Sequence, residues 1–197
     1  MSTKLPKLDT LEDLHNLVQR FQAAEKDNDV ETQQEIMKLL IRNEQEAYQR
    51  KLRLLAELKT LKQEARASED ETRRVKRLIA LFKFCAELRR IGHDELADRE
   101  TGDKATGAAL KASEALKSIG PTGTSALAEL LDDASVSVRC SAAIHLLRLF
   151  PDKAVPVLMK IEKEAIGTSV AVSAGFALSY HKWDLEREAK PTPSPSS

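Results

Sequence analysis

The chain has 197 residues, of which 42% are hydrophobic and only 4% aromatic. Ala, Leu, Glu, Lys and Arg dominate, as in packed helices, so we expect an all-α protein and exclude a β-sandwich or barrel. The 31 Lys and Arg residues balance 31 Asp and Glu residues, so no overall charge favours nucleic acid or an anionic membrane as partner. No stretch resembles a signal peptide or approaches the roughly 18 apolar residues of a membrane span, which indicates a cytoplasmic protein.

A helical hairpin with one long arm is predicted for residues 1–67. Helical spacing of apolar residues predicts a first helix over about 10–25, and the absence of Gly and Pro predicts a single long helix over 30–66. Apolar residues recur every seven positions along it, at Leu40, Ala47, Leu54 and Leu61. Glu44 and Lys51 interrupt the companion positions of this heptad, so packing on the protein's own helices is favoured over a homodimer.

A basic helix is predicted next. Ser68 and Glu71 form a capping box at its start, and Gly92 is expected to end it. One face is apolar, and the other carries the chain's one basic stripe: Arg73, Arg74, Lys76, Arg77, Lys83 and Arg90. Most such stripes are solvated faces, and this one lacks the aromatic and amide groups that nucleic-acid contacts use. The residues retained as candidate partner-binding side chains are Arg73, Arg77, Lys83 and Arg90.

The following segment and the C-terminal tail have weaker patterns. Residues 93–119 are rich in Ala and Lys and predict two helical pieces, because Gly102 and Gly107 weaken the region between them. The last residues, 186–197, are rich in Pro and Ser and are predicted to form a disordered tail.

Two segments of the C-terminal region repeat each other. The run from Val138 to Leu146 aligns with the run from Val170 to Leu178 at an offset of 32, and the helices before them align at 31. Each unit is therefore predicted to be a helix hairpin. Two hairpins leave one face uncovered and a stable stack needs about three, so earlier helices must cover that face.

The first unit, PTGTSALAELLDDASVSVRCSAAIHLLRLF, resembles a HEAT repeat. An apolar helix leads to an acidic turn, which a Val-Arg step and two small residues follow. The residues that carry the pattern are Asp132, Asp133, Arg139, Ala142 and Ala143, with Ala174 and Gly175 in the second unit. The resemblance implies that Asp and Arg tie the turn and that small residues let helices approach closely. Ala171 replaces Arg139 in the second unit, as in a terminal, capping repeat.

The resemblance implies a fold for residues 68–185: helical hairpins stacked as a short HEAT-like α-solenoid, preceded by long N-terminal helices. Residues from about 75 to 185 are also similar to a small uncharacterised bacterial HEAT-like family, a domain of unknown function. The shared features are an apolar opening at Leu78, the segment LLDDASVSVRCSAA, the Pro-Asp-Lys-Ala turn at 151–154 and the late Ala-Gly pair. This resemblance implies fold more than function, because the family has no established activity.

No catalytic, cofactor or metal signature is found in the sequence. His93 and Asp94 belong to its one cluster of His and carboxylates, but on a helix they point about 100° apart and do not converge on a metal. No Gly-rich phosphate loop or nucleophile elbow is present. Cys85 and Cys140 stand among apolar neighbours, as buried thiols do. We therefore expect a protein that is not an enzyme.

A second set of candidate partner-binding residues lies in the first repeat unit. Ser141, His145 and Arg148 are spaced to form one exposed edge of its second helix, and second helices line the concave side of HEAT-like stacks. The alternative is that they are ordinary surface residues. Trp183, after the last unit, is expected to pin the following helix to the stack rather than serve as an exposed anchor.

A non-enzymatic protein-binding module is the function that these features favour. Its most concrete form is a bacterial immunity or antitoxin protein that covers the active site of a cognate toxin. One alternative is a structural scaffold or oligomeric adaptor that uses the long N-terminal helix. A second is nucleic-acid binding through the basic helix at 73–90, which is the less favoured partner class. The chain itself is expected to be a monomer or a homodimer.

Overall fold

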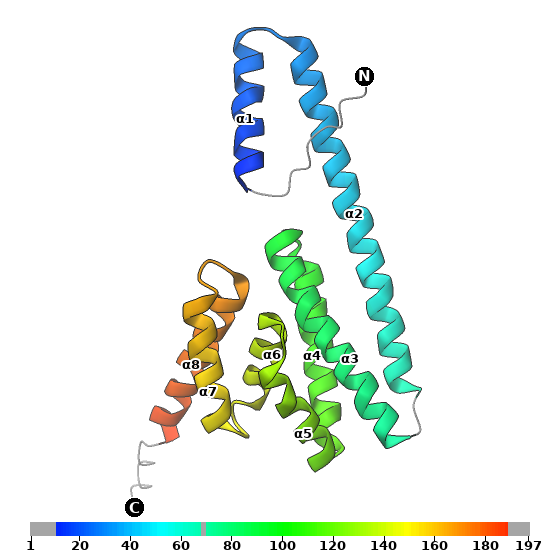
Figure 1. Ribbon diagram of the computed structural model, residues 1–197, viewed down its shortest axis with the longest axis vertical. Coiled ribbons are helices and arrows are strands. Elements are labelled where there is room, and N and C mark those ends of the chain that lie inside the picture. Colours follow the sequence, from blue (N-terminus) through cyan, green and yellow to red (C-terminus); the bar gives the residue numbers. More distant parts are fainter. Residues whose placement is uncertain (1–10, 68–69, 189–197) are drawn as a thin grey trace, which may run out of the picture. The chain divides into compact units, whose positions relative to one another are not determined.

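The computed structural model describes residues 11–67 and 70–188, where all regular secondary structure is helical. Helix α1 spans Leu11–Lys26 and α2 spans Val30–Arg66, which matches the two helices predicted for this region (Figure 1). The chain forms two compact units, the first ending at Leu54 and the second starting at Leu55, so α2 contributes to both. None of the described helices is both long and apolar enough to cross a bilayer.

The first unit has a small apolar core between α1 and the first half of α2. Leu17, Ile36 and Leu39 are buried there, and Phe21 and Leu40 pack against them. Leu40, a residue of the predicted heptad, is thus used within the hairpin. A different row of α2 residues is exposed, namely Met37, Ile41, Tyr48 and Leu52. At 3.6 residues per turn these four lie on one face of α2, and we call them the α2 stripe.

In the second unit, the end of α2 is followed by α3, which spans Glu71–Arg90. Its N-cap is Asp70, whose carboxylate accepts a hydrogen bond of 2.9 Å from the Arg73 amide, whereas Ser68 lies outside the described residues. The α-helix ends at Arg90, two residues before the predicted stop at Gly92, and the chain continues through a π-helical turn, Ile91–Glu95. The predicted break between Gly102 and Gly107 is wrong, since α4 spans Arg99–Ser118 without interruption.

A close approach between backbones explains two of these glycines. A Cβ atom on Gly92 would stand 2.8 Å from the Gly102 nitrogen, closer than real Cβ atoms come to backbone. A Cβ atom on Gly102 would stand 2.5 Å from His93 Nε2. Glycine at 92 and 102 therefore lets the π-helical turn pack on the start of α4, while Gly107 faces open space.

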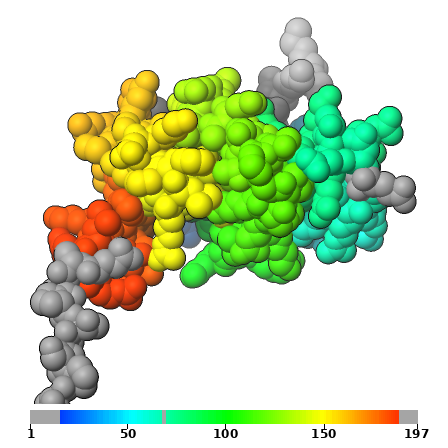
Figure 2. Space-filling model, turned by 90° about the horizontal axis from the view of Figure 1, so that it is seen from below, coloured from blue at the N-terminus to red at the C-terminus, as the bar shows by residue number. Residues whose placement is uncertain are grey.

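The remaining helices pack one on the next in chain order (Figures 1 and 2). Helix α5 spans Pro121–Glu129 and leads through the 3-10 turn η2, Leu130–Asp132, into α6, Val136–Leu146. Helix α7 spans Pro151–Glu164 and α8 spans Ser169–Glu188, so the first residues of the predicted tail are helical and the rest lie outside the described residues. The largest fully buried side chains include Phe82, Leu88, Leu116, Leu127, Leu146, Leu158 and Ile161.

Candidate functional site

A cavity of about 560 Å³ lies between α3, α4, α6 and α8, and we call it the central groove. Its wall is mostly apolar, with Ala86, Ala109, Ile144 and Ala177 among the lining residues. Its volume falls in the range of about 300–1,000 Å³ typical of ligand sites. The polar residues that line it include Arg89, Ser141, His145, Arg148 and Asp184.

Large apolar side chains line this groove and are also exposed. Phe176 is 73% exposed, Tyr180 57% and Leu110 46%. Tyr180 stacks beside Trp183 with ring centroids 5.7 Å apart, and the Arg187 guanidinium lies 4.9 Å from the Trp183 ring centroid. Trp183 is 51% exposed, more than its predicted pinning role implies. Phe176 is not among the residues predicted from sequence, where it is simply the apolar residue that aligns with Ile144 of the first repeat unit.

Ser141, His145 and Arg148 all line the central groove, but the prediction that they form an exposed edge is wrong for Ser141 and His145. Ser141 is 6% exposed and His145 is largely covered. The reason is that α3, α4 and α8 surround this side of α6. Arg148 is exposed, and its Nη2 atom lies 2.6 Å from Asp184 Oδ2.

His145 is a neutral, hydrogen-bonded ring at physiological pH. Burial lowers its pKa to about 4, helped by the charges of Lys117 and Arg89. Its Nδ1 atom lies 3.1 Å from Ser113 Oγ, which is also 2.8 Å from the Leu110 carbonyl oxygen. That carbonyl can only accept, so we assign the hydroxyl proton to it and the ring proton to Nδ1. His145 Nε2 is then an acceptor.

The other polar groups of the groove are engaged inside the protein. Asp184 is only 7% exposed, and its Oδ1 atom makes no hydrogen bond although Arg187 Nη2 lies 3.4 Å away. Arg89 donates to the Ser173 hydroxyl and so links α3 to α8. These contacts fix the walls of the groove and leave its apolar surface as the main feature open to a ligand.

Three of the six cations of the basic stripe predicted on α3 make side-chain contacts within the chain. Arg77 donates to the Glu64 carbonyl oxygen at 2.9 Å, at the end of α2. Lys83 pairs with Asp133 at 2.6 Å, and Arg90 pairs with Glu87 and Glu95. Arg73 is exposed. Three of the four candidate cations on α3 therefore stabilise packing between elements.

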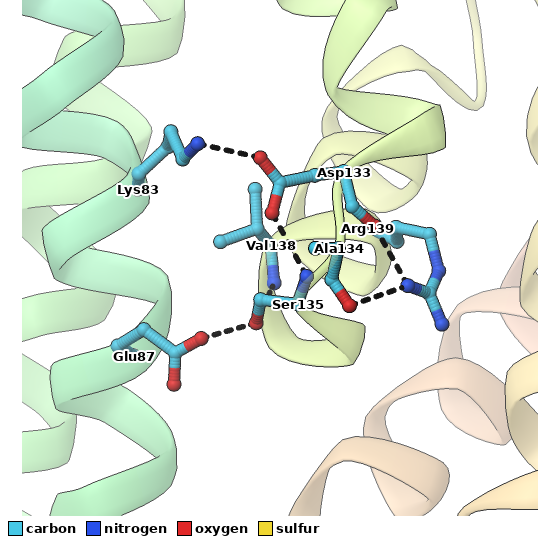
Figure 3. Close-up of polar contacts among 7 residues, drawn as sticks. All are labelled: Lys83, Glu87, Asp133, Ala134, Ser135, Val138 and Arg139. Carbon is cyan, nitrogen blue, oxygen red and sulfur yellow. Dashed lines mark hydrogen bonds and ion pairs between the residues drawn. The ribbon is translucent and has the colours of Figure 1, made fainter.

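The turn before α6 is held by two sets of contacts (Figure 3). Arg139 donates to the carbonyl oxygens of Asp133 and Ala134, at 2.7 and 3.0 Å, and so ties the turn to its own helix. Lys83 and Glu87 of α3 reach the Asp133 carboxylate and the Ser135 hydroxyl. Asp132 points to solvent.

The contacts of this turn also lower the pKa of the Asp133 carboxyl group. Burial alone would raise the pKa of the Asp133 carboxyl, but hydrogen bonds from Lys83 and the Ser135 amide, with the nearby charges of Lys83 and Arg139, lower it. The small residues of the repeat are at packed positions: Ala142, Ala143 and Ala174 are fully buried. A Cβ atom on Gly175 would stand 2.8 Å from Glu162 Oε1 on α7.

The described residues form neither a metal site nor a reactive thiol. No group of three His, Cys, Asp or Glu side chains in that part of the chain is placed to hold a metal ion. Cys85 and Cys140 are buried free thiols, as predicted, and burial raises their pKa values to about 12 and about 11. Both thiols thus stay protonated and unreactive at neutral pH.

In comparisons with known proteins, no family model, curated protein or solved structure matches this chain.

Proposed function

We propose that this chain is a non-catalytic protein-binding module whose central groove holds the apolar face of a partner's helix. The observation that carries the proposal is the exposure of Phe176 beside Leu110 and Tyr180 along an apolar cavity. Contiguous exposed apolar surface on a folded protein marks a binding site, and aromatic side chains contribute much of the binding energy at such sites. A HEAT-like stack, as expected from the repeat at 121–180, would carry this groove on its concave side.

The experiment compares three immobilised proteins in extracts of the native host: the wild type, Phe176→Glu and Ile166→Glu. Ile166 is the matched control, because it is 81% exposed, apolar and outside the groove. We expect a partner that the wild type and Ile166→Glu retain and Phe176→Glu loses. The purified partner should then bind Phe176→Ala at least about tenfold more weakly than the wild type. Equal retention by all three proteins would contradict the proposal.

In its most specific form, we propose that the partner is a toxin and that the chain is its immunity or antitoxin protein. The apolar central groove is compatible with this form, because steric cover of an active site requires affinity rather than catalytic groups. The test is co-expression with the product of the neighbouring reading frame. The wild type should restore growth and Phe176→Glu should not. If expression of the neighbouring reading frame alone does not inhibit growth, the toxin hypothesis is wrong. The proposal for the central groove is then tested by the binding experiment above.

The α2 stripe favours a second candidate, an adaptor that self-associates through α2. Met37, Ile41, Tyr48 and Leu52 are exposed on one face, which is a self-complementary surface for two copies of this helix. We expect light scattering after size-exclusion chromatography to show a dimer, and Ile41→Glu combined with Tyr48→Glu to give a monomer. A wild-type monomer at the highest soluble concentration would sink this candidate.

A further inference from the structure

A second groove, of about 320 Å³, lies between α3, α4 and the last turns of α2. Its floor is apolar and consists of Ala65, Leu78, Leu81, Ala108, Ala112 and Ala115. Its polar lining residues are Lys62, Arg66, Arg74 and Lys111, with no carboxylate among them. We call it the basic groove. On α4, Ala108 and Ala115 point about 160° away from Thr106 and Leu110, which line the central groove, so the two grooves use opposite faces of this helix.

The four cations of the basic groove form no ion pair with the described part of the chain. This sets them apart from Lys83, Arg90 and Arg148, which all pair with carboxylates. Two of the four, Lys62 and Arg66, follow each other by one turn of α2, and the other two come from α3 and α4. Positive charge from three helices therefore surrounds an apolar floor, although the chain as a whole is neutral. Such an arrangement attracts and orients an anionic partner.

We propose that the basic groove binds an acidic amphipathic helix of a partner protein. An apolar side chain of that helix would cover the alanine floor, where small residues permit close approach of two helices. Carboxylates on both sides of the helix would meet the surrounding cations, and Arg66 and Arg74 offer paired N–H donors that match a carboxylate. This site is separate from the central groove, and the proposal does not depend on the function proposed for that groove.

Nucleic acid fits this groove less well than an acidic helix does. No aromatic, Asn or Gln side chain lines it, so bases would find neither a stacking surface nor an amide partner. Phosphates could approach the cations but would leave the floor of alanines and leucines uncovered. A helix that is apolar in the middle of one face and acidic on both sides of it matches both the apolar floor and the basic side chains around it.

The test uses the full chain and a fluorescent designed helical peptide of about four turns, with a row of Leu flanked by Glu. A second peptide carries Gln in place of each Glu. We expect the Glu peptide to bind, the Gln peptide to bind at least about tenfold more weakly, and added salt to weaken the binding. Arg74→Glu combined with Lys111→Glu should weaken Glu-peptide binding at least about tenfold, because two attractions become repulsions.

The matched control is Lys153→Glu combined with Lys163→Glu on α7, which changes the net charge equally at exposed cations outside the groove. This control and Phe176→Glu should bind the Glu peptide as the wild type does. Lys111→Gln, at an exposed position, provides a milder variant if the double reversal fails to fold. Equal binding of both peptides, equal loss in the α7 control, or tighter Arg74-dependent binding of duplex DNA or phosphatidylserine vesicles would each overturn the proposal.

Discussion

The imidazole of His145 is held uncharged in a crowded interior. Its ring packs edge-on against Phe82 with centroids 5.4 Å apart, and Lys117 donates to its backbone carbonyl at 2.7 Å. Burial and the cations Lys117 and Arg89 lower the ring's pKa to about 4, whereas in an unfolded chain it is about 6.5. Between these values the unfolded chain binds a proton that the folded chain does not.

Acidification should therefore destabilise the protein through His145. Above about pH 6.5 this group has no effect, and as the pH falls towards 4 it should remove up to roughly 3 kcal/mol from the free energy of unfolding. His145→Asn keeps an N–H donor for Ser113 but does not titrate, so its stability should decline less over the same range. Urea denaturation of both proteins at several pH values measures the difference. Parallel curves for the two proteins would show that His145 does not carry the effect.

Gly92 and Gly107 should respond to alanine with opposite signs, because their surroundings differ. Gly92 has the Gly102 backbone within 3 Å of its missing Cβ, so Gly92→Ala forces the π-helical turn and α4 apart and should destabilise by about 1–3 kcal/mol. Gly107, inside α4, faces open space, so Gly107→Ala should stabilise by about 0.5–1 kcal/mol through helix propensity. Chemical denaturation of both variants checks this. A neutral or stabilising Gly92→Ala would mean that the two elements separate without cost.

Helix positions follow from local patterns, which is why the sequence predicts α1, α2 and the hairpins of the repeat. The errors concern what surrounds each helix. A glycine that ends a helix and a glycine that admits another backbone look the same in sequence, so the end of α3 near Gly92 is predicted but the contact of Gly92 with Gly102 is not. Nothing in the local sequence signals that a backbone 10 residues further along will come within contact distance.

The candidate sites show the same limit. Spacing places Ser141, His145 and Arg148 on one side of α6, but only the packing of α3, α4 and α8 decides that this side is interior. The basic stripe is predicted, yet the partner of Lys83 is Asp133, 50 positions away in the sequence. The basic groove joins cations from three helices, so no single stretch of sequence contains its pattern.

The two units have cores of very different size. In the first unit, the described cluster contains Leu17, Ile36 and Leu39 with two partly buried neighbours. The second unit buries large side chains from every helix between α3 and α7 and also Leu58 and Ala65 of α2. Since each buried aliphatic side chain contributes about 1.5–3 kcal/mol before the entropy of ordering is subtracted, the second unit should carry most of the stability.

A chain that begins at Leu55 should consequently fold alone, with a cooperative thermal transition within about 5 °C of that of the full protein. It retains the buried residues Leu58 and Ala65, and Ala65 lines the basic groove together with residues of α3 and α4. A chain that begins at Glu71 lacks this part of α2 and leaves Leu78 and Leu81 uncovered, so its melting temperature should be clearly lower. Circular dichroism melts of the three chains make the comparison. If the Leu55 chain melts without cooperativity, the first unit supplies contacts that the second needs, and the stability of this protein is shared across both units.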